Sequence, residues 1–151
     1  EPWIWRVPGV TKAGSTSAEP ICGIDLMPTV LALTGHDAVS HTVDGVDIAA
    51  ALRAEEMPER PLFWHYPHYG NQGGFPSSAI RLGHWKLIER SEDGRVHLFD
   101  LAEDLGERND LATQHPDRVD NMRRLLHAWY QEVDAKFLRE HKGVIPWRPS
   151  K

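Results

Sequence analysis

The stretch from Leu62 to Glu89 constrains the fold of this chain most strongly, because it cannot form a helix. Pro67 and Pro76 each lack an N–H donor and disfavour helical backbone at the preceding residue, and four glycines raise the entropic cost of ordering it. Its last part contains two short β-prone runs, SSAIR and WKLIE, which meet at Gly83. The pattern therefore predicts a strand, a long loop and then further strands.

The loop of this stretch is also the best candidate for a binding site. Large aromatic residues and histidines alternate over residues 62–69, and a tract rich in glycine and asparagine follows. Exposed loops on a rigid scaffold are where function concentrates, and an imidazole suits sulfate, phosphate or sugar hydroxyls. The alternative is a surface turn whose histidines have no role. The predicted substrate-binding residues are His65 and His68 first, and then Tyr66, Tyr69 and Asn71.

The composition excludes several classes of function. The chain has 151 residues, a formal net charge of −5 and a pI near 6.0, whereas a nucleic-acid-binding protein is expected to carry a basic face. No run of 18 apolar residues is present, so we expect no membrane span. His65 and His68 flank Pro67 and match no zinc motif, and we therefore expect no metal site at this loop. Cys22 has no cysteine to pair with, and its apolar context favours a structural role.

The first third of the chain is predicted to be a strand followed by a buried helix. Residues 3–7 are aromatic and β-branched and stop at Pro8-Gly9, which predicts a strand and a turn. Asp25 fits a helix N-cap, and the apolar residues up to Gly35 predict a helix buried on most of its circumference. Asp44-Gly45 predicts a turn before a short helix over 48–53. We place a boundary after residue 56, so that 1–56 end a large α/β domain and 57–151 form a second subdomain.

The second subdomain is predicted to be an antiparallel meander covered by one long helix. Residues 91–94 (SEDG) predict a tight hairpin turn before a third strand, VHLFDL. The longest helix is predicted over 117–137, because apolar residues recur at spacings of three and four. This stripe is expected to cover the sheet. It consists of Val119, Met122, Leu126, Trp129 and Val133.

The charged residues of this subdomain have simpler interpretations than a binding site. Arg81 and Lys86 flank Gly83, where they suit an anion, but ion pairs with neighbouring carboxylates such as Glu89 or Asp100 are the favoured interpretation. The acidic run over residues 100–110 matches no EF-hand spacing. We interpret it as a solvated connector.

Taken in order, these segments resemble the C-terminal part of sulfatases. The helix of the D-L-x-P-T type and the following D-G segment are both present, with Asp47 where the family usually has serine. An R-x-G-x-[WY]-K-L strand pair begins at Arg81. The sequence LFDL at residues 98–101 matches the family's L-Y-D-L strand. The acidic connector resembles D-P-x-E-x-x-N-L-A, with Leu105 for the usual proline and Asp110 for the common asparagine. The resemblance covers nearly the whole chain, and the order and spacing of the motifs make it specific.

The resemblance implies a fold and an activity for the whole protein. The fold is an alkaline-phosphatase-like α/β architecture with a small antiparallel C-terminal subdomain. The activity is hydrolysis of sulfate esters on sulfated carbohydrate, with a calcium ion and a formylglycine nucleophile, in a periplasmic or secreted enzyme. The formylglycine signal is C-x-P-x-R, whereas Cys22 is followed by Gly23 and Ile24, and the calcium ligands have no counterpart. We therefore expect this chain alone to be inactive, to bind no cofactor and to require the remainder of a sulfatase chain.

Two other functions remain open from the sequence. A phosphodiesterase or phosphonate hydrolase of the same superfamily shares the fold and differs in the ester that it cleaves. A non-catalytic carbohydrate- or anion-binding module would use the aromatic loop alone. The module would fold reversibly by itself, whereas a sulfatase fragment is expected to expose an apolar surface and to be poorly soluble.

Overall fold

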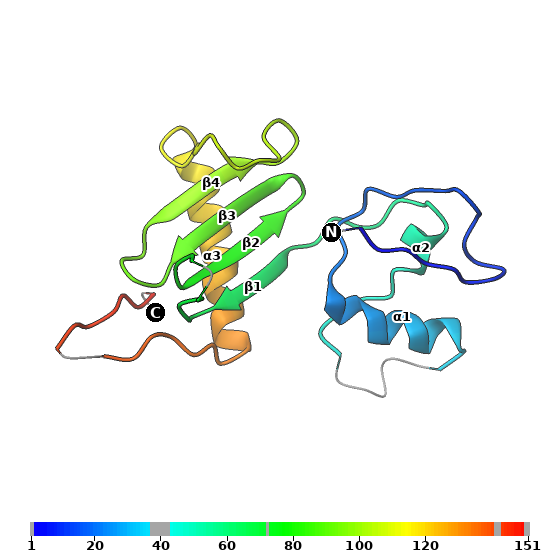
Figure 1. Ribbon diagram of the computed structural model, residues 1–151, viewed down its shortest axis with the longest axis horizontal. Coiled ribbons are helices and arrows are strands. Elements are labelled where there is room, and N and C mark those ends of the chain that lie inside the picture. The colour runs from blue at the N-terminus through cyan, green and yellow to red at the C-terminus, as the bar shows by residue number, and fades with distance from the viewer. Residues whose placement is uncertain (1, 37–42, 72, 141–142, 150–151) are drawn as a thin grey trace. The chain divides into compact units, whose positions relative to one another are not determined.

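The computed structural model describes residues 2–36, 43–71, 73–140 and 143–149. These residues form two compact units, 1–59 and 60–151 (Figure 1). The division lies close to the predicted boundary after residue 56. The assignment of the first unit to the end of a larger α/β domain stays a prediction.

The second unit contains the predicted antiparallel meander. Its four strands are β1 (Leu62–Tyr66), β2 (Ser77–Leu82), β3 (Trp85–Arg90) and β4 (Val96–Asp100), and they pair in the order β1-β2-β3-β4. Helix α3 (Pro116–Glu132) covers one face of this sheet (Figure 1). The loop between β1 and β2 is the long loop that the prolines and glycines predict, and both connections after β2 are tight hairpin turns.

The core of this unit lies between the sheet and α3. Paired core-facing residues of neighbouring strands, such as Ile80 and Leu87, stand opposite each other in the register. The Phe63 ring stacks on Trp129 of α3, with centroids 4.9 Å apart. The buried members are Ile80, Leu87, Leu98, Val119, Met122, Leu126 and Tyr130.

The predicted helix stripe is confirmed at Val119, Met122 and Leu126 and is wrong at its end. Val133 is half exposed, and Tyr130 takes the corresponding place in the core. The reason is that α3 ends at Glu132, and Asp134 adopts a φ of +49° that turns the chain away. The predicted continuation to Phe137 is therefore also wrong, although the Phe137 side chain still packs against this core.

Among the described residues of the first unit, three short helices are held together by a buried aspartate and a buried threonine. The helices are η1 (Gly23–Asp25), α1 (Leu26–Leu33) and α2 (Ala49–Leu52). The Asp25 carboxylate accepts hydrogen bonds from the backbone N–H groups of Cys22 and Val46, at 2.8 and 3.0 Å. The Thr29 hydroxyl donates to the Asp25 carbonyl at 2.6 Å and accepts from the Ile48 N–H at 3.0 Å. These two side chains therefore tie the segment before α2 to α1, a structural role for the D-L-x-P-T motif.

Two expectations for this unit are wrong. Residues 3–7 form no strand, because a strand requires a ladder with a neighbour and no described segment pairs with them. Helix α1 is not mostly buried: Leu26, Met27 and Val30 are 48%, 51% and 44% exposed, because no described part of the unit covers that face. Only Pro28 and Thr29 of this helix are buried.

Replacing Gly45 by alanine is expected to loosen the first unit. A Cβ at this position would lie 2.2 Å from the Ile24 carbonyl oxygen, so the backbone must move apart. We expect a loss of roughly 2–4 kcal/mol in local opening free energy, measured by hydrogen exchange at the Val46 and Ile48 amides. Gly23→Ala is the matched control, because a Cβ there meets nothing within 4 Å. Unchanged protection in the Gly45 variant would contradict the close approach.

Candidate functional site

The loop between β1 and β2 presents most of the predicted binding residues to solvent. Tyr66 and Tyr69 are 57% and 65% exposed, and His68 and Asn71 are exposed as well. The rings of Tyr66 and His68 meet edge to face, with centroids 5.4 Å apart. The structure therefore brings the rings of Tyr66 and His68 together. Tyr69 and Asn71 follow in the same loop, and this set of residues exposes polar atoms to an external ligand.

His65 differs from the other candidates because both of its ring nitrogens are engaged inside the subdomain. Nδ1 lies 2.7 Å from the Ser78 hydroxyl, and Nε2 lies 2.6 Å from the Lys136 carbonyl oxygen. A carbonyl only accepts, so Nε2 carries a proton and donates it to Lys136. The ring also packs against Tyr130 and Phe137. His65 thus joins β1 to the segment after α3.

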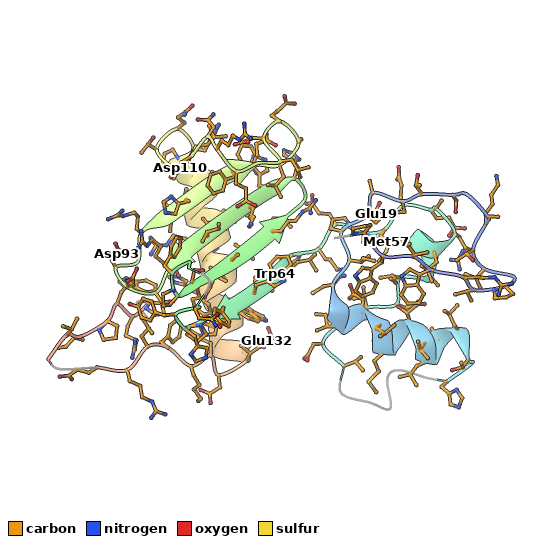
Figure 2. All side chains as sticks on the ribbon, in the orientation of Figure 1. Glu19, Met57, Trp64, Asp93, Asp110 and Glu132 are labelled. Carbon is orange, nitrogen blue, oxygen red and sulfur yellow. The ribbon has the colours of Figure 1, made fainter. Side chains whose placement is uncertain are left out.

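The turn between β3 and β4 contacts the loop through a residue that sequence reasoning did not single out. Glu92 accepts a hydrogen bond from the Tyr69 hydroxyl at 2.9 Å and another from Arg90 at 2.6 Å. These bonds from Arg90 and Tyr69 hold the pKa of Glu92 below its usual value, and the bond to Glu92 raises the pKa of Tyr69. Residues 91–94 were interpreted only as a turn, and no spacing rule relates Tyr69 to Glu92. Figure 2 shows Asp93 of the same turn at the end of the β3–β4 hairpin.

A buried carboxylate lies between the sheet and α3. Glu89 is 1% exposed and accepts hydrogen bonds from Arg123 at 2.9 Å, from His127 at 3.0 Å and from the Tyr130 hydroxyl at 3.1 Å. Burial raises the pKa of Tyr130 well above its usual value, which keeps the phenol protonated as a donor. This cluster joins β3 to α3. The sequence reasoning missed it, because Glu89 was expected to pair with Arg81 or Lys86.

The two cations that flank Gly83 also have internal partners. Lys86 forms an ion pair with Glu107 at 2.6 Å. The predicted ion pair is therefore confirmed for Lys86, but its partner is neither Glu89 nor Asp100. The Arg81 Nε donates to the Gly83 carbonyl at 3.0 Å. Neither observation favours an anion site at the β2–β3 turn.

The acidic run is more than a solvated connector. The Asp104 carboxylate accepts the N–H groups of Arg108 and Asn109, both at 2.7 Å. Burial would raise the pKa of Asp110, but hydrogen bonds from the Leu98 and Ala112 N–H groups and from His97 outweigh it, and the pKa lies below its usual value. These carboxylates shape the connection from β4 to α3.

The described residues contain neither a group of metal ligands nor a C-x-P-x-R signal. Within the described ranges, no group of three or more His, Cys, Asp or Glu side chains is arranged to hold a metal ion. Cys22 is a free, half-buried thiol at the start of η1, where its backbone N–H donates to Asp25. In the part of the chain that the structure describes, no helix has the length and apolarity to cross a bilayer.

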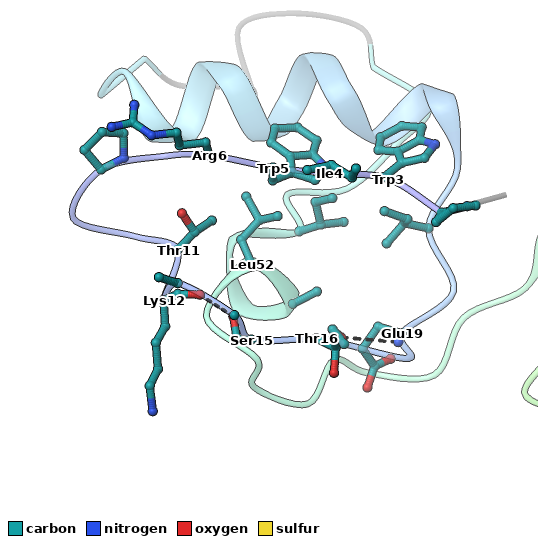
Figure 3. Close-up of a pocket in the computed structure, with 18 residues that line it drawn as sticks. Trp3, Ile4, Trp5, Arg6, Thr11, Lys12, Ser15, Thr16, Glu19 and Leu52 are labelled. Atoms are coloured by element: carbon teal, nitrogen blue, oxygen red, sulfur yellow. Dashed lines mark hydrogen bonds between the residues drawn. The ribbon is translucent and has the colours of Figure 1, made fainter.

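The first unit contains a hollow of about 830 Å³ (Figure 3). It is lined mainly by the segment 2–17 and by α2, including Trp3, Trp5 and Leu52. Two hydroxyl groups there bond within their own loop, since Thr11 donates to the Val7 carbonyl at 3.1 Å and Ser15 donates to the Lys12 carbonyl at 2.8 Å. Figure 3 shows no convergence of ionisable side chains on one point, so this hollow is not the better candidate.

Comparison with known proteins identifies the family. The family described as N-sulphoglucosamine sulphohydrolase, C-terminal, matches residues 1–136. A sulfatase from Formosa agariphila is 33% identical over 151 aligned residues, which cover 89% of this chain and 27% of that protein. Arylsulfatase K from Danio rerio is 25% identical, covering 95% of this chain and 28% of that protein. The chain therefore belongs to the family of sulfatase C-terminal regions, and the resemblance seen in the sequence is confirmed.

Solved structures support the same fold. BT4656, solved in complex with its substrate D-glucosamine-2-N,6-O-disulfate, superposes with a TM-score of 0.70 at 22% identity, covering 85% of this chain and 28% of that one. A putative sulfatase from Bacteroides thetaiotaomicron gives 0.58 at 26% identity, covering 73% of this chain and 24% of that one. The antiparallel sheet with its C-terminal helix is thus a sulfatase fold element. The chain spans about a quarter of the length of the curated relatives that it matches.

Proposed function

We propose that this chain is the C-terminal part of a sulfatase that hydrolyses sulfate esters on a sulfated carbohydrate. The observation that carries the proposal is the family match over residues 1–136, which extends through both compact units. Two neighbours of the same fold were solved with saccharides, one with D-glucosamine-2-N,6-O-disulfate and one with k-i-k-neocarrahexaose. These support the carbohydrate class of the substrate. A periplasmic or secreted location belongs to the same proposal.

The described residues do not include the reactive groups that such an enzyme requires. Cys22 lies outside a C-x-P-x-R signal, and the described residues hold no cluster of metal ligands. We assign formylglycine, which supplies the nucleophile, and calcium, which stabilises charge on the sulfate, to another part of the enzyme. The described residues then bind and orient the saccharide and take no part in breaking the ester bond.

The loop from Tyr66 to Asn71 is the part of this chain that we assign to the substrate. Its exposed imidazole, the Tyr66 phenol and the Asn71 amide supply donors for sulfate oxygens and sugar hydroxyls, and its ring faces, that of Tyr69 included, suit the apolar side of a sugar. His68, Tyr66, Tyr69 and Asn71 are the proposed contacts. His65 was predicted as a contact, but its two internal bonds support a positioning role, in which it fixes the strand that carries the loop.

The class of reaction is tested with the full-length enzyme. We expect it to hydrolyse 4-nitrophenyl sulfate and at least one of two saccharides, D-glucosamine-2-N,6-O-disulfate and a carrageenan hexasaccharide, and to be much slower on phosphate esters. The isolated 151 residues are expected to hydrolyse none of them. A preference for phosphate esters would favour a phosphodiesterase or phosphonate hydrolase instead. Sugar binding by the isolated chain, without hydrolysis by the full-length protein, would favour a binding module.

A further inference from the structure

The loop between β1 and β2 is attached to the β3–β4 turn at several points. Near its middle, the Tyr69 hydroxyl donates to Glu92 at 2.9 Å. At its end, the Pro76 carbonyl accepts from the Ser91 N–H at 2.8 Å, and both residues are buried. The Arg90 guanidinium lies 4.3 Å from the centroid of the neighbouring Phe75 ring. The loop is thus held by the turn.

Within this turn, Glu92 has the central place. One of its oxygens accepts from Tyr69, and the other accepts from Arg90 at 2.6 Å. Arg90 is in turn held near Asp93, whose carboxylate lies 4.0 Å from Nε. A carboxylate that accepts from a guanidinium on one side and a phenol on the other has a fixed orientation.

The turn itself is held by the C-terminal segment. Gly94 has a φ of +71°, and a Cβ at this position would lie 2.3 Å from the Trp147 indole nitrogen. The backbone N–H of Trp147 also donates to the Glu92 backbone carbonyl at 3.4 Å. The indole therefore packs directly on the turn, so that Glu92 is fixed through its backbone as well as its side chain.

We propose that Glu92 is a positioning residue, which holds the Tyr69 ring in the orientation that receives the saccharide and so determines specificity for the sugar. The inference rests on the proposed function of the loop. Tyr69 is 65% exposed, so burial orients its ring only weakly, and the bond to Glu92 is its one hydrogen bond among the described contacts. Hydrogen bonds between exposed groups contribute little to folding. Loss of the Tyr69–Glu92 bond is therefore expected to let the Tyr69 ring change its orientation without unfolding the second unit.

The test uses the full-length enzyme, 4-nitrophenyl sulfate, and whichever of the two saccharides named above the wild type hydrolyses faster. Tyr69→Phe keeps the ring and loses the donor, and Glu92→Ala loses the acceptor. Each variant is expected to raise KM for the saccharide roughly 3- to 10-fold with little change in kcat. Glu92→Ala, which removes no proposed substrate contact, is expected to leave the aryl sulfate unaffected. The double variant is expected to be no worse than the poorer single variant, because both remove the same bond. Glu92→Gln retains an acceptor and is expected to keep most of the saccharide affinity.

Glu103→Ala is the matched control, since it removes an exposed carboxylate from another loop and is expected to behave as wild type. Equal effects on saccharide and aryl sulfate, additive effects of the two substitutions, or wild-type KM in both single variants would overturn the positioning role alone. A wild-type enzyme without sulfate-ester hydrolysis would overturn the proposed function, and the inference with it.

Discussion

Replacing Glu89 by alanine is expected to lower the local stability of the second unit by about 3 kcal/mol. The carboxylate is buried and accepts from Arg123, His127 and Tyr130, all of them on α3. Removing it leaves a half-buried guanidinium, an imidazole and a buried phenol without their acceptor, and it leaves a cavity at the sheet–helix interface. Arg123 is partly exposed, so water recovers some of the loss. Native-state hydrogen exchange at the Leu87 and Leu126 amides measures the change.

Two further variants make this measurement specific. Glu89→Gln keeps the shape and one acceptor but not the charge, so an intermediate loss is expected. Glu132→Ala removes an exposed carboxylate at the end of α3 and is expected to change the stability by less than about 0.5 kcal/mol. If Glu89→Ala matched Glu132→Ala, the buried cluster would not be what joins the sheet to the helix.

The elements of the second unit could be predicted from the sequence because their signals are local. Proline and glycine around the β1–β2 loop exclude a helix, Gly83 and Gly94 mark the two tight turns, and α3 has a regular apolar stripe. The end of α3 was less predictable. The apolar pattern continues to Val133, whereas the backbone turns at Asp134 with a positive φ that no local residue signals.

The first unit shows where local signals are insufficient. The run from Trp3 to Val7 has strong β propensity, but propensity does not supply a neighbouring strand. Likewise, the apolar surface of α1 predicted burial, although the residues that would cover it must come from another segment. Asp25 and Thr29 were recognised through the family motif, but their roles in fixing the segment before α2 became clear only from the hydrogen bonds.

The assignment of the aromatic loop to the substrate stays a prediction, and the contacts within the loop were not predicted from the sequence. Residue types alone identified the aromatic loop, and its exposed members lie where a ligand can reach them. His65 lies on β1 and is engaged inside the subdomain, whereas His68 lies beyond the end of β1 in the loop and is exposed, a division that residue types alone do not give. Glu92 was not predictable, because its contact with Tyr69 arises only when the turn packs against the loop.

Replacing His68 by alanine is expected to impair hydrolysis of the sulfated saccharide by the full-length enzyme, roughly 10- to 100-fold in kcat/KM, while sparing a small aryl sulfate. His68 is exposed, and the one ring contact described for it is the edge-to-face contact with Tyr66, so its loss should not disturb folding. A side chain that binds the sugar part of a substrate contributes nothing to a substrate that lacks the sugar. Thermal unfolding is expected to match that of the wild type.

His65→Ala is the contrasting variant at the same loop. It removes the bonds to Ser78 and Lys136 and the ring contacts with Tyr130 and Phe137. We expect it to lower Tm and to reduce hydrolysis of both substrates together, because it disturbs the support of the loop rather than one sugar contact. If His65→Ala reduced hydrolysis of the saccharide alone and left Tm unchanged, the result would indicate that His65 contacts the substrate directly.

We propose that this chain supplies saccharide-binding residues of a sulfatase, and the ratio of kcat/KM for the sulfated saccharide to that for 4-nitrophenyl sulfate tests this proposal most directly. The ratio is measured for the wild-type full-length enzyme and for its His68→Ala variant. A ratio at least tenfold lower in the variant, with the aryl sulfate rate retained, is the predicted result. An unchanged ratio would contradict the claim, whether both activities fell together or neither fell.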